Sequence, residues 1–145
     1  MNKEHFRKLE RMYLEANIQK ELYESTTIKI EHKRTEIGMM VSDKYFHALN
    51  GMHGSVYFKL LDDAAFFAVN SVISDVCVLT TSFNINLVRP VGLGKIHAVG
   101  ELRFQSRNLF VAEAQLFNEA GKEVAFGTGH FAKSKVVLSE EIGYT

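Results

Sequence analysis

The stretch HALNGMHGSVYFKLLDDAAFFAVNS, residues 47–71, decides which fold the sequence predicts. From Gly54 onward its apolar residues recur at helical spacing and cover nearly every side of the predicted helix, which we expect to end near Asp75. A helix that is apolar on most sides is buried, and alanines on one stripe allow a sheet to approach it closely. The residues of this stripe are Tyr57, Leu61, Ala64, Ala65, Ala68 and Val72.

Two neighbouring carboxylates, Asp62 and Asp63, interrupt this apolar helix. At about 100° per residue, Asp63 falls opposite the stripe, where we expect it to pair weakly with Lys59 on a solvated face that also holds Asn70. Asp62 instead falls among apolar neighbours, namely Phe58, Phe66 and Val69. An unpaired carboxylate in such a place is costly. Asp62 is therefore either a hydrogen-bonded structural residue at a subunit interface, or a general base or nucleophile.

The sequence on either side of this helix predicts strands. Residues 2–24 have the spacing of an amphipathic helix, residues 26–33 and 36–42 alternate as two short strands, and residues 43–50 read as a loop. Four more strands are predicted after the helix, over residues 77–89, 95–106, 109–117 and 123–134. Strands that cluster after a single buried helix predict an α+β domain, with a curved antiparallel sheet of about six strands wrapped around that helix.

Composition narrows the class of protein. Among 145 residues, 17 basic side chains balance 17 acidic ones, so neither nucleic acid nor an anionic membrane is an expected partner. The charged N-terminus is not a signal peptide and no apolar run could span a membrane, which makes a cytoplasmic location the expectation. Cys77 is the single cysteine, and we interpret it as a buried small apolar residue rather than a reactive thiol.

The start of the helix, NGMHGS at residues 50–55, offers backbone hydrogen-bond donors to a ligand. First-turn N–H groups have no partner inside a helix and can donate to an anion or a polarised carbonyl oxygen. Gly54 leaves its N–H sterically open, but Asp62 lies roughly 12 Å further along the axis at 1.5 Å per residue. If both groups act on one carbonyl, they come from different subunits of a dimer; otherwise this is an ordinary helix start.

Three stretches together carry a family resemblance: HGSVYFKLLDDAAFFAVNS, TTSFNINLVRPVGLGKIHAVGEL and SRNLFVAEAQLFNEAGKEVAFGTGHF. Over roughly residues 25–133, the sequence resembles the hotdog-fold acyl-CoA thioesterases of the PaaI type. The helix-start motif of that family is His-Gly-Gly, followed by an Asp or Glu eight residues after the first Gly. Here His53, Gly54, Ser55 and Asp62 occupy these positions, with Ser55 in place of the second Gly.

The resemblance implies roles for particular residues. Asp62 would activate water or attack the thioester carbonyl, while the Gly54 N–H of the other subunit would polarise that carbonyl. Thr80 matches a strand position that often holds Ser or Thr and would position the water. The family has an Asn six residues before the motif His, where this sequence has His47. A neutral imidazole can also donate a hydrogen bond, so His47 either takes over that role or is a surface loop residue.

The resemblance also implies an activity and an assembly. The activity is hydrolysis of acyl-CoA or aryl-acyl-CoA thioesters to free acid and CoA, without a metal or redox cofactor. The assembly is a homodimer or homotetramer whose subunits pair their sheets edge to edge, with the active sites at the dimer interface. Contacts to CoA would come from His53 and Ser55 at the helix start, from Arg89, and from a turn that comprises Ser106, Arg107 and Asn108. The alternative is that Arg89 and this turn are simply solvated.

Two other functions remain open on sequence alone: a non-catalytic acyl-CoA-binding or regulatory hotdog protein, for which the His47 departure speaks, and a purely structural oligomer. The sequence does not rank the acyl groups. We expect the chain to divide into an N-terminal helix at residues 1–24, a hotdog thioesterase domain at 25–135 and a C-terminal tail at 136–145.

Overall fold

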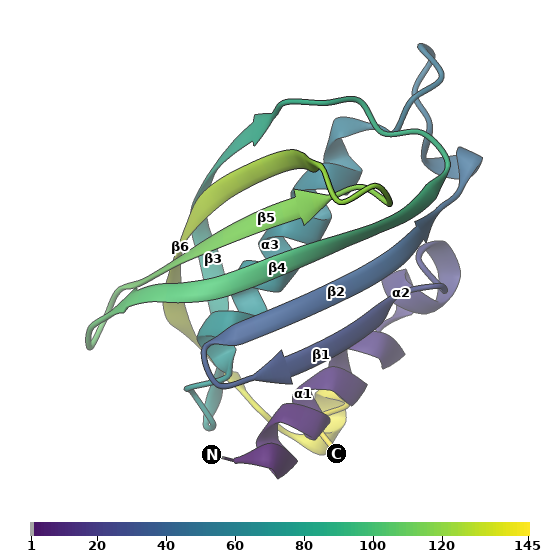
Figure 1. Cartoon of the computed structure of the whole chain (residues 1–145). Coiled ribbons are helices and arrows are strands. Elements are labelled where there is room, and N and C mark those ends of the chain that lie inside the picture. Colours follow the sequence, from purple (N-terminus) through teal and green to yellow (C-terminus); the bar gives the residue numbers. More distant parts are fainter. Residues whose placement is uncertain (1) are drawn as a thin grey trace.

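The computed structural model describes residues 2–145 and contains one six-stranded antiparallel sheet curved around a long helix, α3 (Figure 1). Residue 1, with which the expected N-terminal segment begins, lies outside the described residues. The strand order is β1-β2-β4-β5-β6-β3. The predicted α+β class is confirmed. The bounds are β1 Thr27–Glu31, β2 Arg34–Val41, α3 Gly54–Asn70, β3 Val76–Leu87, β4 Gly94–Gln105, β5 Phe110–Phe117 and β6 Glu123–Val137.

Helix α3 is buried as its composition predicts. Of the six predicted stripe residues, all but the half-buried Val72 belong to the buried core. The helix ends at Asn70 rather than near Asp75, because the Asn70 amide directs the chain back toward β3. Its Nδ2 donates to the carbonyl oxygens of Ile73 and Val76 at 3.1 and 3.0 Å, and its Oδ1 accepts from the Val78 N–H at 2.9 Å. Asn70 is therefore buried, and its expected place on a solvated face is wrong.

A glycine sets how closely the sheet approaches α3. A Cβ atom added to Gly100 in β4 would lie 2.2 Å from the carbonyl oxygen of Ala64 and 2.7 Å from the backbone nitrogen of Ala65. No side chain fits in that space, so β4 touches the helix backbone directly. The two alanines on the helix side complete the close contact.

The N-terminal segment forms two helices instead of one: α1 Lys3–Glu15 and α2 Asn17–Leu22. Ala16 separates them with an extended ψ of 143°. Buried residues of α1, including Leu9 and Tyr13, join the core. The C-terminal residues pack beside this helix, with both termini close together in Figure 1: the Tyr144 hydroxyl lies 2.7 Å from Nδ1 of His5, whose Nε2 lies 2.9 Å from the Asn70 carbonyl oxygen.

The sheet has two edges, β1 and β3, and the outer edge of β3 is unpaired in this subunit. Strand β3 is 12 residues long, and it and the residue after it leave three large apolar side chains substantially exposed: Leu79, Leu87 and Val88. The loop predicted at residues 43–50 contains a short 3-10 turn at Asp43–Tyr45. Across residues 2–145, no helix is both long and apolar enough to cross a bilayer.

Candidate functional site

Asp62 lies halfway along α3 and is half-buried. The Thr80 hydroxyl on β3 donates to Asp62 Oδ1 at 2.8 Å. Burial disfavours the ionised carboxyl and raises the pKa of Asp62 from its usual 3.8 to about 6, with a smaller rise from the neighbouring Asp63 charge and an opposing effect of the Thr80 hydrogen bond. An aspartate with such a pKa is ionised near neutral pH yet basic enough to accept a proton.

Strand alternation directs Thr80 toward the helix. Thr80 pairs with the buried Phe131 of β6, and a register shift follows between Thr80 and Ser82. The β-bulge changes which side chains face α3 over the rest of β3. The hydrogen bond between Thr80 and Asp62 is a contact that the sequence did not predict, and the expected part of Thr80 in positioning water stays a prediction.

A hollow of about 500 Å³ opens beside Asp62, within the size range of ligand pockets, roughly 300–1,000 Å³. Its walls come from α1, α2, α3, β3 and the C-terminal 3-10 turn Glu140–Ile142. Eight lining residues are apolar or weakly polar: Met12, Ala16, Ile18, Phe66, Phe67, Cys77, Leu79 and Ile142. Cys77 is half-buried, whereas we expected a buried residue, and desolvation raises the pKa of its thiol.

Lys59 and Asp63 form the predicted pair, at 2.6 Å, but the prediction of a solvated face is wrong. Their side chains are only 14% and 21% exposed, because α1 and α2 cover this side of α3. Lys59 Nζ also donates to the Tyr13 hydroxyl at 3.2 Å and to Gln19 Oε1 at 3.0 Å. The Tyr13 hydroxyl in turn donates to Asp63 at 2.7 Å. This network attaches the N-terminal helices to the site helix.

The start of α3 presents a free donor. His53 is the N-cap residue, and its Nδ1 accepts from the Ser55 N–H at 3.0 Å and lies 2.8 Å from the Ser55 hydroxyl. The Gly54 N–H has no acceptor among residues 2–145. Gly54 lines a second hollow, of about 320 Å³, together with His47, Met52, Tyr57, Leu87, Val88, Arg89 and Pro90.

His47 is held in a defined orientation in this second hollow. Its Nδ1 accepts from the Leu49 N–H at 3.0 Å, so a neutral His47 carries its proton on Nε2. The short hairpin around it is closed by a bridge between Phe46 and Met52 and by a hydrogen bond from the His47 N–H to the Gly51 carbonyl oxygen at 2.9 Å. The ring therefore offers one N–H donor near Gly54.

The remaining predicted contacts are spread over the surface. His53 and Ser55 line a third hollow, of about 390 Å³, beside Lys44. The guanidinium of Arg89 donates to the Glu123 carbonyl oxygen at 2.6 Å. The hairpin between β4 and β5 has its tip away from the start of α3 (Figure 1), and this tip carries Ser106, Arg107 and Asn108. One subunit thus brings Asp62 to Thr80, and His47 to Gly54 and Arg89, but does not unite the two groups.

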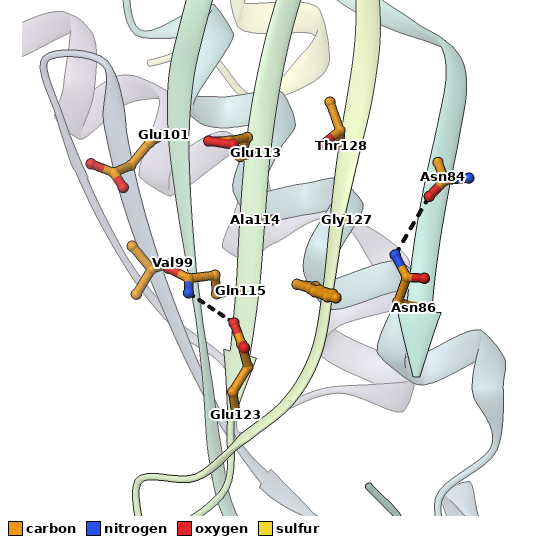
Figure 2. Close-up of a pocket in the computed structure, with 11 residues that line it drawn as sticks. Asn84, Asn86, Val99, Glu101, Glu113, Ala114, Gln115, Glu123, Gly127 and Thr128 are labelled. Atoms are coloured by element: carbon orange, nitrogen blue, oxygen red, sulfur yellow. Dashed lines mark hydrogen bonds between the residues drawn. The ribbon is translucent and has the colours of Figure 1, made fainter. Parts of the chain in front are cut away.

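A fourth hollow, of about 400 Å³, lies on the face of the sheet turned away from α3 (Figure 2). Two polar contacts lie at its sides: Gln115 to Glu123 at 2.8 Å, and Asn86 to Asn84 at 3.5 Å. None of the predicted site residues lines it. It is separated from Asp62 by the sheet.

Sequence reasoning missed the contribution of the N-terminal segment to the Asp62 hollow, because that segment carries no chemical motif. The available signal was the amphipathic pattern of Phe6, Leu9, Tyr13 and Ala16, which requires a covered surface. The pattern alone does not say which surface of the domain is covered.

Comparison with known proteins bears on the fold and the family. The family model described as thioesterase superfamily matches residues 49–125. The PaaI protein of Escherichia coli, from the phenylacetic acid degradation operon, superposes with a TM-score of 0.83 at 21% identity, over 94% of this chain and 97% of that chain. A Streptococcus mutans protein crystallised with acetyl-CoA has a TM-score of 0.70 at 21% identity, over 75% and 88% of the two chains.

A third similar structure is a mutant of a Staphylococcus aureus thioesterase, with a TM-score of 0.76 at 19% identity over 82% of this chain and 99% of that chain. None of the curated proteins matches the sequence significantly. The solved structures share the sheet curved around one helix, and the family match spans more than half of the sequence. The chain therefore belongs to the thioesterase superfamily, with a hotdog fold similar to that of PaaI.

Proposed function

We propose that the protein hydrolyses acyl-CoA thioesters to a free acid and CoA. The observation that carries the proposal is the state of Asp62: a half-buried carboxylate, held by Thr80 at 2.8 Å, with its pKa raised to about 6, in the wall of a largely apolar hollow. Membership of the thioesterase superfamily supports the same reaction class.

In the proposed reaction Asp62 acts as general base. Thr80 occupies Oδ1 and leaves Oδ2 for a water molecule. Oδ2 accepts a proton from that water as its oxygen attacks the thioester carbonyl carbon, and the carbonyl oxygen becomes an oxyanion. The oxyanion accepts a hydrogen bond from the Gly54 N–H. When the tetrahedral intermediate collapses, the carbon–sulfur bond breaks and the proton on Asp62 passes to the departing CoA thiolate.

This division of labour requires two subunits. Gly54 and Asp62 are about 12 Å apart along one helix at 1.5 Å per residue, and they open into different hollows. We propose a homodimer, alone or within a homotetramer, in which the unpaired edge of β3 pairs with the same edge of a second subunit. The length of β3 and the exposed Leu87 and Val88 at its end support this interface.

For the CoA portion we propose the region around the start of α3. There His47 and Arg89 share a hollow with Gly54, and His53 and Ser55 line the neighbouring one. The relative from Streptococcus mutans, crystallised with acetyl-CoA, supports a CoA ester as ligand. The turn of Ser106, Arg107 and Asn108 stays a proposed phosphate contact from a second subunit.

The test is thiol release from a panel of acyl-CoAs by wild type, Asp62→Asn and the matched control Asp43→Asn. Asp43 is exposed in the 3-10 turn and lines neither the hollow beside Asp62 nor the hollow that holds Gly54. We expect turnover by wild type and the control, and loss of at least about a thousandfold in kcat for Asp62→Asn. Absence of turnover on every ester, with CoA-ester binding by calorimetry, would replace the enzyme by a binding module.

A further inference from the structure

The hollow beside Asp62 has an apolar mouth. Ile18 on α2, Leu79 on β3 and Ile142 near the C-terminus line it, yet they are 49%, 56% and 38% exposed. Large apolar side chains from three separate elements thus converge on one opening without covering it. A ligand that removed this surface from water would gain roughly 25 cal/mol for each Å² buried.

The charged groups in the same hollow are already satisfied or negative. Lys59 is the cationic residue of the lining, and its three N–H donors contact Asp63, Tyr13 and Gln19. No cationic donor of the lining is left for a new anion. With Lys59 paired to Asp63, Asp62 leaves the lining with one excess negative charge, so an anionic group that entered the hollow would lose hydration and be repelled.

These properties decide which half of a CoA thioester fits here. The CoA half carries phosphates, which the excess negative charge of the hollow repels, and it exceeds a hollow of about 500 Å³ that is mostly apolar. The acyl half begins at the carbonyl that Asp62 must face. The hollow is therefore suited to the substituent on the acyl side of that carbonyl.

We infer that this hollow is the acyl pocket and that it selects neutral, apolar acyl chains of several carbons over acetyl and over acyl groups that end in a carboxylate. The inference rests on the proposed thioesterase function and adds its substrate class. Selectivity comes from apolar surface at the mouth and from the internal neutralisation of Lys59.

The first experiment compares kcat/KM for acetyl-, hexanoyl-, octanoyl- and adipoyl-CoA, the last being hexanoyl-CoA with a terminal carboxylate. We expect kcat/KM to rise about fourfold per methylene from acetyl to hexanoyl. We expect adipoyl-CoA to fall at least about a hundredfold below hexanoyl-CoA. A preference for acetyl-CoA, or adipoyl-CoA equal to hexanoyl-CoA, would overturn the inference while leaving the thioesterase function intact.

A charge introduced into the pocket tests the mechanism of selection. Ile18→Lys places a free cation at the mouth, and Ile18 is exposed enough for the substitution to leave folding intact. We expect the hexanoyl-to-adipoyl ratio of kcat/KM to fall at least about tenfold. The matched control is Met40→Lys, a similarly exposed apolar residue on β2 that lines none of the hollows, and it should leave the ratio unchanged.

Filling the pocket tests its position. Ala16→Phe inserts a ring at the bend between α1 and α2, and Ala120→Phe makes the same change in the exposed turn after β5. We expect the octanoyl-to-acetyl ratio to fall at least about tenfold for Ala16→Phe and to stay constant for Ala120→Phe. Equal effects of the two substitutions would place the acyl chain elsewhere.

Binding measurements separate this inference from the reaction itself. If no ester is hydrolysed, calorimetry with the thioether analogues of hexanoyl- and adipoyl-CoA reads the pocket directly. Tighter binding of the hexanoyl analogue by wild type, with the difference reduced in Ile18→Lys, would support the pocket although the proposed hydrolysis had failed. Equal binding of the two analogues would reject it.

Discussion

Gly54 and Asp62 belong to one helix and open into two separate hollows of the same subunit. Gly54 is the first helical residue, where proline is well tolerated, and His53 before it has the extended ψ of 143° that proline requires of its neighbour. Gly54→Pro therefore removes the free N–H without a helix defect. We expect kcat to fall by roughly 10²–10³, the effect of losing an oxyanion donor. Thiol release on purified, folded variant measures it.

The control for this substitution is Gly54→Ala, which keeps the N–H. Its Cβ would lie 3.5 Å from Leu87 Cδ1, an ordinary contact, so most of the activity should remain. If Gly54→Pro and Gly54→Ala were equally active, the N–H would have no role in the reaction.

Mixing two inactive variants tests the shared site. A mixed dimer of Asp62→Asn and Gly54→Pro subunits contains one site with both native groups and one with neither. Random exchange at equal concentrations should restore about a quarter of wild-type activity, because half of the dimers are mixed and each has one of two sites intact. Activity that stays at the level of the separate variants after subunit exchange would put both groups within one subunit.

The raised pKa of Asp62 predicts the acid side of the pH–rate profile. The reaction needs the ionised carboxylate, so kcat/KM should rise with pH through a pKa of about 6. Thr80→Ala removes a hydrogen bond that favours the ionised form. It should therefore raise the apparent pKa of this acid limb by roughly half a pH unit or more. Thr80→Ser retains the hydroxyl and should restore the wild-type profile. If Thr80→Ala left the apparent pKa of the acid limb unchanged, the titration of Asp62 would not be the cause of that limb.

The same pKa predicts a stability gain for the inactive variant. The folded protein holds the Asp62 proton more tightly than the unfolded chain does, so the free energy of unfolding falls as pH rises from about 4 to about 6 and stays lower above that. Asp62→Asn removes this loss. With allowance for solvent screening of a half-buried group, we expect a gain of about 1–2 kcal/mol at about pH 7.5 and none near pH 4. Urea unfolding at the two pH values measures it, with Asp43→Asn as control.

The resemblance to PaaI-type thioesterases predicts an asparagine where this chain has His47, whose ring offers an N–H on Nε2. His47→Asn replaces one donor by another, so kcat should stay within roughly threefold of wild type. His47→Phe keeps a ring but no donor and should lower kcat by roughly ten- to a hundredfold. Comparable rates for the phenylalanine and asparagine variants would show that His47 is a surface loop residue.

The sequence was sufficient for features that depend on local spacing. The strands alternate visibly, and the stripe containing Tyr57 and Leu61 follows from helical spacing alone. The isolation of Asp62 among apolar neighbours also follows from that spacing, and the resemblance selected it over Asp63. The bend at Ala16 and the helix end at Asn70 were missed, since both depend on contacts with distant segments.

The surroundings of Lys59 and Asp63 show why the rest was out of reach. Their pairing is a matter of four-residue spacing and was predicted, but their burial depends on where α1 and α2 pack. Likewise, periodicity does not tell how β3 is aligned against α3, which is what brings the Thr80 hydroxyl to Asp62. Likewise, Ile18 lines the hollow because of where α2 packs, which the sequence pattern does not show.

Gly100 helps to set the position of Asp62, although it lies far from the site in sequence. It lies on β4, whereas Thr80 lies on β3, on another face of the same helix. Because the helix backbone rests on the bare Cα of Gly100, a methyl group there would displace α3 away from β4. The position of the Asp62 carboxylate therefore depends on a residue outside the active site. Gly100→Ala would move Asp62 away from Thr80 although residue 100 contacts neither of them.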